Sequence, residues 1–319
     1  MRSTSLMCRR ISCLLVFVAL TASFADAAFA DASMLGRAWT ILPGQVETVT
    51  VNPGRENVLA STIDGIAQWC ILPGATVRIH LEDGTYKSNR TVRIDHPDGA
   101  RVQIIGNTGA PEKVRLVWPA KTDGIYVGMG GALGRLDGVT ILREIPGGND
   151  NGARDNATGL LAENAGVLQA GPAVVVDGFY YGAQARYGGV IRARGVQVRH
   201  AGDAGFFAYN GGHIEAQDSS AVDAHDVELA LGSGYVAEYG GTLDASRARA
   251  QTNALAGFTA LSGGSIVANG ARAIGNKQYG FYAQTNGAIV AHRGSVLSSG
   301  QAPASFTQGG GSITGLEGH

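Results

Sequence analysis

Three ionisable residues recur at one interval along the chain. Equal steps separate Asp177 from His200 and His200 from Asp223. A histidine changes charge near neutral pH, so one placed between two carboxylates suits the role of general base or general acid. Paired carboxylates are also the groups that glycosidases use. The spacing therefore predicts that these residues supply acid and base groups, if the fold brings them together.

A sequence repeat with the same interval runs from Gly124 to the C-terminus. Its period of about 23 residues predicts a solenoid, in which each unit buries its apolar face on its neighbours. Short apolar alternations separated by glycines indicate three short strands per coil, as in a parallel β-helix. Turns at the corners account for many of the 48 glycines. Aligned copies open at Gly124, Gly159, Gly182, Gly205, Gly234, Gly257 and Gly280, with a degraded copy at Ala304.

The repeat is interrupted twice, on either side of the ionisable residues. The Gly124 coil carries 12 extra residues that begin near Arg143, and the Gly205 coil carries 6 that begin near Ala224. Both insertions follow the Gly-Gly pair by the same distance, so we expect them at one corner, about 14 Å apart along the axis. They would form the walls of a groove a few sugar rings wide.

Asp177, His200 and Asp223 follow the opening glycines of their coils by the same count, which places them in one column on the floor of this groove. Later coils have Thr252, Gly275 and Ser298 at that position. Carboxylates two coils apart would be about 9 to 10 Å from each other, near the upper end of the spacing in inverting glycosidases. An alternative is that these side chains cap backbone groups in turns.

Neighbouring residues predict how the groove would hold a ligand. Tyrosines suit packing against sugar rings, and arginines suit the carboxylates of uronic acids. The expected floor residues are Tyr180, Tyr181, Arg199 and Asp203; the first wall supplies Arg143, Asn149, Asp150, Arg154 and Asp155, and the second supplies His225, Asp226 and Glu228. No cofactor is predicted, although the polar segment 147–152 is either a solvated loop or a calcium loop.

The N-terminal residues have the pattern of a secretory signal peptide. Arg9 and Arg10 precede an apolar stretch over 11–24, and Ala28-Phe29-Ala30 suits cleavage. Residues 1–30 therefore predict a secreted, periplasmic or cell-surface protein. Beyond them Cys70 is the one remaining cysteine, and we expect it to be a buried apolar residue.

The formal net charge of the chain is -1, and no basic patch indicates nucleic acid as a partner. No stretch after the signal peptide is apolar enough to span a membrane. Residues 31–319 are expected to form a single domain: an entry segment and cap over 31–75, first coils over 76–123, and repeats over 124–319. Apolar residues at helical spacing predict a helix over 57–69, which would cover the open end of the solenoid.

Strands are expected over 46–51, 75–81, 91–94 and 102–105. Polar residues at one corner, Asn253, Asn276 and Ser299, are expected to stack as a structural ladder.

Two segments after the predicted helix carry a family resemblance. Val77-Arg78-Ile79-His80-Leu81-Glu82-Asp83-Gly84-Thr85-Tyr86 and Val102-Gln103-Ile104-Ile105-Gly106-Asn107, with the coils that follow, resemble the pectate-lyase-like superfamily of right-handed parallel β-helices, including bacterial and phage tail-spike relatives. The resemblance implies a right-handed single-stranded helix with a short N-terminal capping helix. It also implies a polysaccharide partner, and a monomer or a homotrimer. The Asn-Thr-Asp and Asp-Asp signature of polygalacturonases is absent, so no catalytic role is carried over.

Taken together, these features predict cleavage of an acidic glycan by β-elimination or hydrolysis. Asp177, His200 and Asp223 would act as acid and base, Arg199 or Arg143 would hold a sugar carboxylate, and a tyrosine would pack on a ring. The alternative is a non-catalytic glycan-binding or surface-adhesion protein that uses the same groove.

Overall fold

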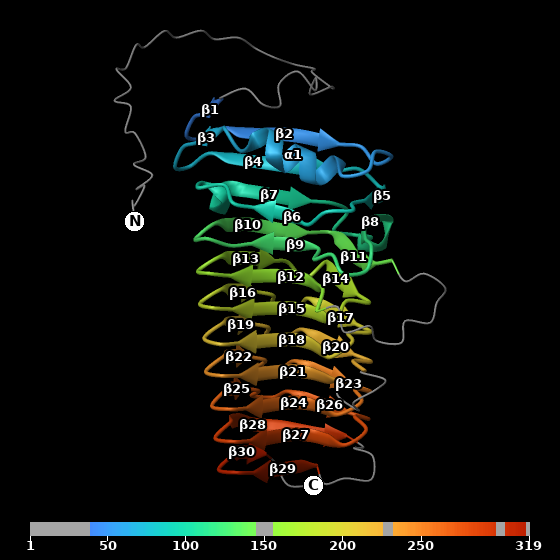
Figure 1. The fold of residues 1–319 in the computed structure, drawn as a ribbon, viewed down its shortest axis with the longest axis vertical. Helices are drawn as coiled ribbons and strands as arrows, with labels where there is room; N and C mark the ends of the chain where they lie inside the picture. The colour runs from blue at the N-terminus through green and yellow to red at the C-terminus, as the bar shows by residue number, and fades with distance from the viewer. Residues whose placement is uncertain (1–38, 145–155, 226–231, 298–303, 317–319) are drawn as a thin grey trace, which may run out of the picture. The chain divides into compact units, whose positions relative to one another are not determined.

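The computed structural model describes residues 39–144, 156–225, 232–297 and 304–316, all within one compact unit, Asp31–His319. The predicted signal peptide lies outside these residues. Figure 1 shows a stack of coils in which each turn of the chain adds one strand to each of three faces. All strand pairs in these faces are parallel, as in β15 with β18 and β16 with β19. The chain is a parallel β-helix, as the repeat predicted.

The strands form three stacked columns, which we call sheets 1, 2 and 3. Sheet 1 contains β2 (Val46–Val51), β4 (Thr76–Leu81), β7 (Val102–Ile105), β10 (Ala132–Asp137), β13 (Val167–Ala170), β16 (Val190–Arg192), β19 (His213–Glu215), β22 (Thr242–Asp244), β25 (Ser265–Val267), β28 (Ala288–Leu297) and β30 (Ser312–Leu316). Sheet 2 contains β5 (Gly84–Lys87), β8 (Val114–Trp118), β11 (Val139–Arg143), β14 (Val174–Asp177), β17 (Gln197–Arg199), β20 (Ser220–Val222), β23 (Arg249–Gln251), β26 (Arg272–Ile274) and the second half of β28. Sheet 3 contains β6 (Val92–Ile94), β9 (Ile125–Val127), β12 (Thr158–Glu163), β15 (Tyr181–Arg186), β18 (Ala204–Tyr209), β21 (Ser233–Glu238), β24 (Ala256–Leu261), β27 (Tyr279–Gln284) and β29 (Ser305–Gln308).

Identical positions of successive coils stack on one another inside the helix. Phe206, Tyr235, Phe258 and Phe281 are fully buried in sheet 3, with neighbouring ring centroids 4.9 to 5.0 Å apart and planes within 12° of parallel. This distance matches the spacing of strands in a sheet, so the coil rise itself sets the ring separation. The apolar alternation of the repeat thus becomes a continuous core.

The Gly-Gly pairs turn the chain from sheet 3 into sheet 1. Gly211 has a φ of +73°, which L side chains rarely adopt, and a Cβ on Gly212 would overlap the carbonyl oxygen of Ala185 in the preceding coil. The two glycines are therefore required for different reasons, one for its conformation and the other for a close approach between coils.

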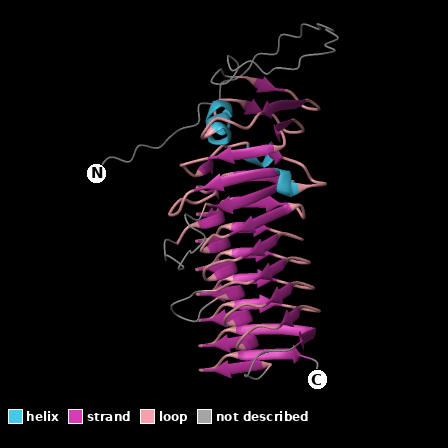
Figure 2. Ribbon diagram, turned by 90° about the vertical axis from the view of Figure 1, so that its right-hand side faces the viewer, coloured by secondary structure: helices cyan, strands magenta, loops and turns pink. Residues whose placement is uncertain are grey.

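The predicted helix is present but shorter than expected. Helix α1 (Val58–Ile66) buries Leu59, Ile63 and Ile66, whereas the apolar spacing predicted residues 57–69. It lies at the N-terminal end of the stack, against β6, where it covers the edge of sheet 3 (Figures 1 and 2). Short 3-10 turns, η1 (Gly99–Arg101) and η2 (Pro111–Lys113), precede β7 and β8.

The prediction for Cys70 was wrong, because its side chain is exposed. Cys70 lies in β3 (Cys70–Ile71), which pairs with β1 (Thr40–Ile41) before the first full coil. In a two-residue strand the two side chains point to opposite faces, and Ile71 takes the buried one.

The predicted strands 46–51 and 102–105 match β2 and β7, and the other two begin one residue later than expected. The predicted polar ladder is confirmed for Asn253 and Asn276. Both are buried, and Asn253 Nδ2 donates to Asn276 Oδ1 over 2.8 Å. Ser299 lies outside the described residues.

Candidate functional site

The two insertions leave the coils at the same corner. The described chain stops at Glu144 after β11 and resumes at Asn156 before β12; it stops again at His225 after β20 and resumes at Gly232 before β21. Both gaps therefore join sheet 2 to sheet 3. The insertion residues themselves, which include Asn149, Asp150, Arg154, Asp155, Asp226 and Glu228 and the predicted calcium segment 147–152, lie outside the described part of the chain.

Asp177, His200 and Asp223 meet at this corner. His200 Nδ1 is 2.7 Å from Asp177 Oδ1, and His200 Nε2 is 4.0 Å from Asp223 Oδ2. The histidine side chain is 53% exposed, so the contact faces solvent. On its other side Asp223 accepts a hydrogen bond from the hydroxyl of Thr252. The contacts of Asp177 with His200 run between side chains, which is not the pattern expected of turn caps.

The register of the coils differs from the simple count by one residue. Asp177 pairs with Arg199, so Gly178 is the residue equivalent to His200. Two compensating changes explain this difference. The coil of β14 has one more residue between sheets 1 and 2 than the next coil, and one fewer between sheets 2 and 3. Asp177 therefore contacts His200 from the preceding position, the last residue of its sheet 2 strand, and not from the position equivalent to His200.

The residues that directly follow the strands of sheet 2 at this corner have a left-handed backbone conformation. The φ angles of Gly178, His200, Asp223, Thr252 and Gly275 lie between 49° and 80°. Non-glycine residues rarely adopt this conformation, which costs about 1 to 2 kcal/mol per residue. A histidine here is therefore less favourable for folding than a glycine would be.

The Asp177 and His200 pair has the geometry of an oriented imidazole. An ionised Asp177 accepts a hydrogen bond from Nδ1, which leaves Nε2 as the basic nitrogen of the neutral ring. A carboxylate in this position fixes the tautomer and stabilises the imidazolium that forms on protonation. The arrangement can accept a proton from a group that approaches Nε2.

The predicted binding residues lie in three different surroundings. Arg143 is buried, and its Nη1 lies 3.5 Å from the carbonyl oxygen of Gly178. Arg199 is exposed on sheet 2 and donates to Gln197 Oε1 over 2.8 Å. His225 is exposed, with Nδ1 2.9 Å from the carbonyl oxygen of Asp223. The remaining three, Tyr180, Tyr181 and Asp203, lie where the corner meets sheet 3.

A depression of about 430 Å³ opens on the outer face of sheet 3, next to this corner. It includes Tyr181 and Asp203 from the predicted set, but not Asp177, His200 or Asp223. Tyr180 is buried, with its ring centroid 4.7 Å from that of Tyr181. The depression is lined by Asn156, Tyr181, Gln184, Arg186, Tyr187, Asp203, Phe207, Tyr209, Glu238 and Tyr239.

The aromatic rings of the depression form a connected surface. The centroid of Tyr209 lies 5.3 Å from that of Phe207 and 5.5 Å from that of Tyr239. Tyr187 and Tyr239 are about half exposed, so their rings remain open to a ligand. Sequence reasoning missed both of these tyrosines. The signal was present, because a Tyr-Gly-Gly triplet occurs at each of them.

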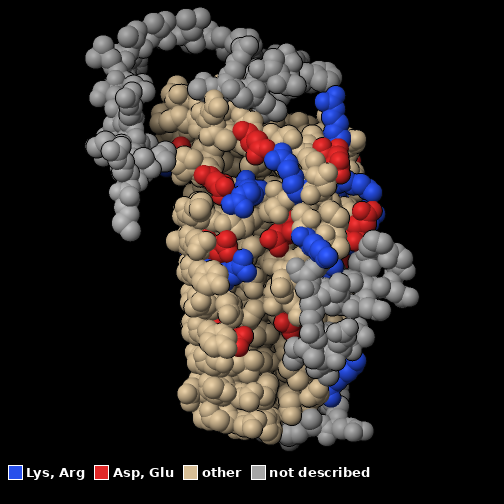
Figure 3. Space-filling view, viewed as in Figure 1, with Lys and Arg blue, Asp and Glu red and all other residues tan. Residues whose placement is uncertain are grey.

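Glu238 lines the depression and has no ion-paired lysine or arginine in the described part of the chain. Arg186 Nε lies 2.7 Å from Glu163 Oε2, so its charge is already paired. Asp203 and Glu238 supply two further carboxylates. Among the residues drawn in colour on this face, the acidic atoms at the level of β21 have no basic atoms beside them (Figure 3).

These charges also act on ionisable neighbours. Burial raises the pKa of Glu238. Burial also raises the pKa of Tyr181, and the charges of Asp203 and Glu238 raise it further, whereas Arg186 acts in the opposite direction. Burial is the largest cause for Tyr181, and among the charges that of Asp203 has the largest effect.

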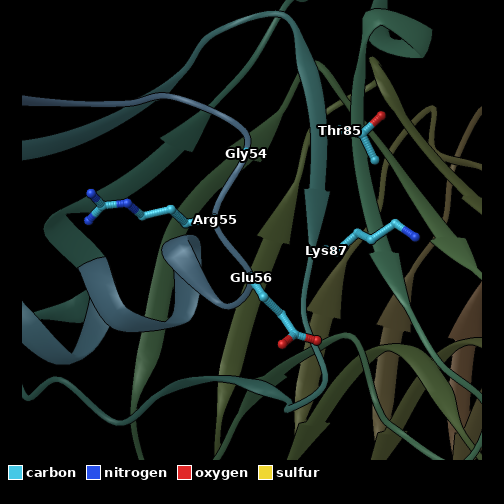
Figure 4. Close-up of a pocket in the computed structure, with 5 residues that line it drawn as sticks. All are labelled: Gly54, Arg55, Glu56, Thr85 and Lys87. Carbon is cyan, nitrogen blue, oxygen red and sulfur yellow. The ribbon is translucent and has the colours of Figure 1, made fainter.

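Two other hollows lie near the N-terminal coils. One, of about 290 Å³, is lined by Gly54, Arg55, Glu56, Thr85 and Lys87. Figure 4 shows the side chains of Arg55 and Lys87 pointing away from each other, so they do not converge on one ligand. The other, of about 390 Å³, contains His80, Glu82, Asp83 and Asn107, and its polar groups bond one another: His80 Nε2 lies 3.5 Å from Glu82, and Asn107 donates to Asp83.

No group of three or more histidine, cysteine, aspartate or glutamate side chains is arranged to hold a metal among the described residues. Within the same residues no helix is long and apolar enough to cross a membrane. Comparisons of the chain with protein-family models, with curated proteins and with solved structures find no match.

Proposed function

We propose that this protein is an exported β-helix that holds a polysaccharide across the depression on sheet 3. The observation that carries the proposal is the connected tyrosine surface of Tyr181, Tyr209 and Tyr239 beside two carboxylates. Aromatic rings with a polar edge suit the apolar faces and hydroxyl groups of sugars. The six residues of β15 extend about 20 Å, which is long enough for several sugar rings.

The superfamily resemblance and the N-terminal segment support the same proposal. A parallel coil capped by an N-terminal helix is the architecture that the pectate-lyase-like resemblance implies. Export through residues 1–30 would place the protein where extracellular glycans occur. Sequencing the N-terminus of the protein recovered from the culture medium or cell envelope tests export, and light scattering distinguishes the monomer from the homotrimer.

Binding is tested by affinity electrophoresis against a panel of soluble polysaccharides. Tyr209→Ala is expected to weaken retention about tenfold, equivalent to about 1.4 kcal/mol, because it removes the central ring of the surface. Tyr282→Ala is the matched control, since Tyr282 lies on sheet 3 outside the depression. Equal retention of the two variants on every polysaccharide would overturn the proposed site.

Cleavage of the bound glycan is the second candidate function, and the contact between Asp177 and His200 favours it. His200 and Asp203 belong to one turn, so their backbones are at most about 11 Å apart. A chain lying in the depression could therefore continue past Nε2 of His200. In elimination this nitrogen would remove a proton from a uronate ring; in hydrolysis it would activate water.

The cleavage candidate is tested with the same panel, read at 235 nm for new double bonds and by reducing-end assay. His200→Ala is expected to abolish product formation while leaving retention on the polysaccharide intact. His213→Ala is the control, because this exposed histidine lies on sheet 1 beside Thr242. Retention of the wild-type protein without products on any substrate would leave the adhesion function and remove the catalytic one.

A further inference from the structure

The charges of the depression point to a particular class of glycan. Glu238 lines it, while Arg186 is held by Glu163, whose other oxygen accepts a hydrogen bond from Tyr126 over 3.0 Å. No lysine or arginine of the described chain is ion-paired with Glu238. A uronate placed here would meet like charges, whereas an ammonium group would meet unlike ones.

The floor of the depression contains a polar group that a sugar can satisfy. Gln184 is only 4% exposed, and its one hydrogen bond to a described side chain joins Oε1 to the Thr158 hydroxyl over 3.5 Å. Its amide nitrogen has no partner in the described part of the chain. This nitrogen is not among the buried polar atoms that lack a partner, so it is open to the depression, where a ligand hydroxyl or carbonyl oxygen can accept its hydrogen bond.

The tyrosine surface fits the same ligand. A cation placed over the face of a tyrosine ring is attracted by the electrons of the ring. Tyr239 is about half exposed and lines the depression together with Glu238, so a ring face and a carboxylate are available to one ligand. An amino sugar presents an ammonium group beside an apolar ring face, and both surfaces would find a partner here.

We infer that the depression on sheet 3 selects polysaccharides that carry free amino groups, such as polymers of glucosamine, over polymers of uronic acids. Glu238 supplies the main counter-charge, Gln184 binds a sugar oxygen, and the tyrosines pack on the rings. This inference rests on the proposed function, because it names the class of glycan that the same site would take. It differs from the acidic glycan that the repeat and its arginines predicted.

The inference is tested by titration calorimetry with four hexasaccharides. They are the hexamers of glucosamine, of N-acetylglucosamine and of galacturonate, and the neutral glucose hexamer cellohexaose. With the full-length mature protein, the glucosamine hexamer is expected to bind at least tenfold more tightly than cellohexaose, at a pH where its amines are protonated. Its affinity should fall as salt is added, since exposed charges are screened. The galacturonate hexamer is expected to bind most weakly.

Glu238→Gln separates charge from shape. This variant is expected to bind the glucosamine hexamer about tenfold more weakly and cellohexaose as before, whereas Glu47→Gln on sheet 1 should change neither affinity. Tightest binding of the galacturonate hexamer, or glucosamine binding that is unaffected by Glu238→Gln, would overturn the amino-sugar inference and leave the binding function standing. Failure of every hexamer to bind, together with no retention of the polysaccharide panel, would overturn the proposed function itself.

Discussion

Glu238 is placed where function and folding make opposite demands. Partial burial raises the pKa of its carboxyl group, so the folded state binds its proton more tightly than the unfolded state does. The stabilisation from this proton is present below the unfolded pKa, near 4.5, and is lost as the pH rises through the raised value. Above its raised pKa the side chain is an ionised, partly desolvated carboxylate, which a cationic ligand would compensate.

The first prediction follows from this residue. Glu238→Gln is expected to raise the free energy of unfolding at pH 7 relative to wild type, with a smaller gain at pH 4, which lies below both the unfolded pKa and the raised one. Urea denaturation at the two pH values measures the difference. An equal change at both pH values would show that packing, not charge, determines the effect.

The pKa of Asp218 is shifted in the opposite direction. It is hydrogen-bonded to Arg247 through both carboxylate oxygens and also to Arg194, and these contacts lower its pKa to about 2. The resulting stabilisation is present above the unfolded pKa, near 3.8, and is lost as the pH falls through about 2.

Asp218→Asn is therefore expected to lower the free energy of unfolding at pH 7, by less than about 1 kcal/mol because the pair is solvent-exposed. Thermal unfolding at pH 7 and at pH 2 measures how this difference changes, and it should shrink at the lower pH. High salt at pH 7 should also reduce it. A deficit that is the same at both pH values would contradict the assignment to charge.

At the scale of the strands and turns, the buried asparagine ladder is sensitive to substitution because its polar groups depend on one another. Asn276 Oδ1 accepts from the backbone nitrogen and the side-chain amide of Asn253, and its own amide donates to Ala250. Replacing Asn276 by alanine leaves these groups buried and unpaired.

Asn276→Ala is expected to lower the free energy of unfolding by about 2 to 3 kcal/mol. Asn269→Ala provides the control, because Asn269 accepts a hydrogen bond from His292 at an exposed position, where water replaces it. Chemical denaturation of both variants measures the contrast. A deficit in Asn269→Ala as large as that in Asn276→Ala would show that burial is not the cause.

The aromatic stack of sheet 3 gives a second prediction at this scale. Phe258 lies between Tyr235 and Phe281, with centroids 4.9 Å away on both sides. Phe258→Ala leaves a cavity in a core whose coil spacing is fixed by backbone hydrogen bonds, and should cost about 3 to 5 kcal/mol. Phe258→Leu, which keeps most of the volume, should cost much less in the same denaturation experiment.

These elements also show what a single sequence can and cannot predict. The regular period of the repeat and its apolar alternation were enough for the coil, for the asparagine ladder and for the common corner of the insertions, because repeats of one length must stack in register. The contact between Asp177 and His200 is present, although the count placed Asp177 one position away from where it lies.

The predictions that were wrong or missing concern positions that the regular repeat does not determine. One added and one missing residue cancel within the coil of β14, so Asp177 lies one position from where the count places it. Cys70 is exposed because Ile71, the other residue of its strand, takes the buried face. The Tyr-Gly-Gly triplets marked Tyr187 and Tyr239, but the depression was missed because it forms only where residues of three successive coils lie side by side.

For the whole described unit, stability should vary along the stack. Each coil contacts the coils directly next to it, so local opening is easiest where a coil has one neighbour. The coil of β29 and β30 is largely exposed and contains few buried side chains, whereas that of β18 and β19 is packed on both sides.

Hydrogen exchange followed by mass spectrometry should therefore find the fastest amide exchange in 305–316 and the slowest in the strands around Phe206 and Tyr235. Helix α1 should protect the amides of β6, although β6 is the first strand of sheet 3. Uniform protection from β6 to β29 would show that the unit opens only as a whole.

The matching backbone register of successive coils has an evolutionary consequence. Because backbone register and core rings match at a fixed offset, duplication or loss of one complete coil after β21 would lengthen or shorten the rod by about 4.8 Å without disrupting the interior. Gene duplications or deletions of whole coils would therefore change the length of the protein in uniform steps. Inserting or deleting a coil between β15 and β21 would change the distance between Gln184 and Glu238. The number of coils can therefore vary without altering the depression only outside the three coils that form it.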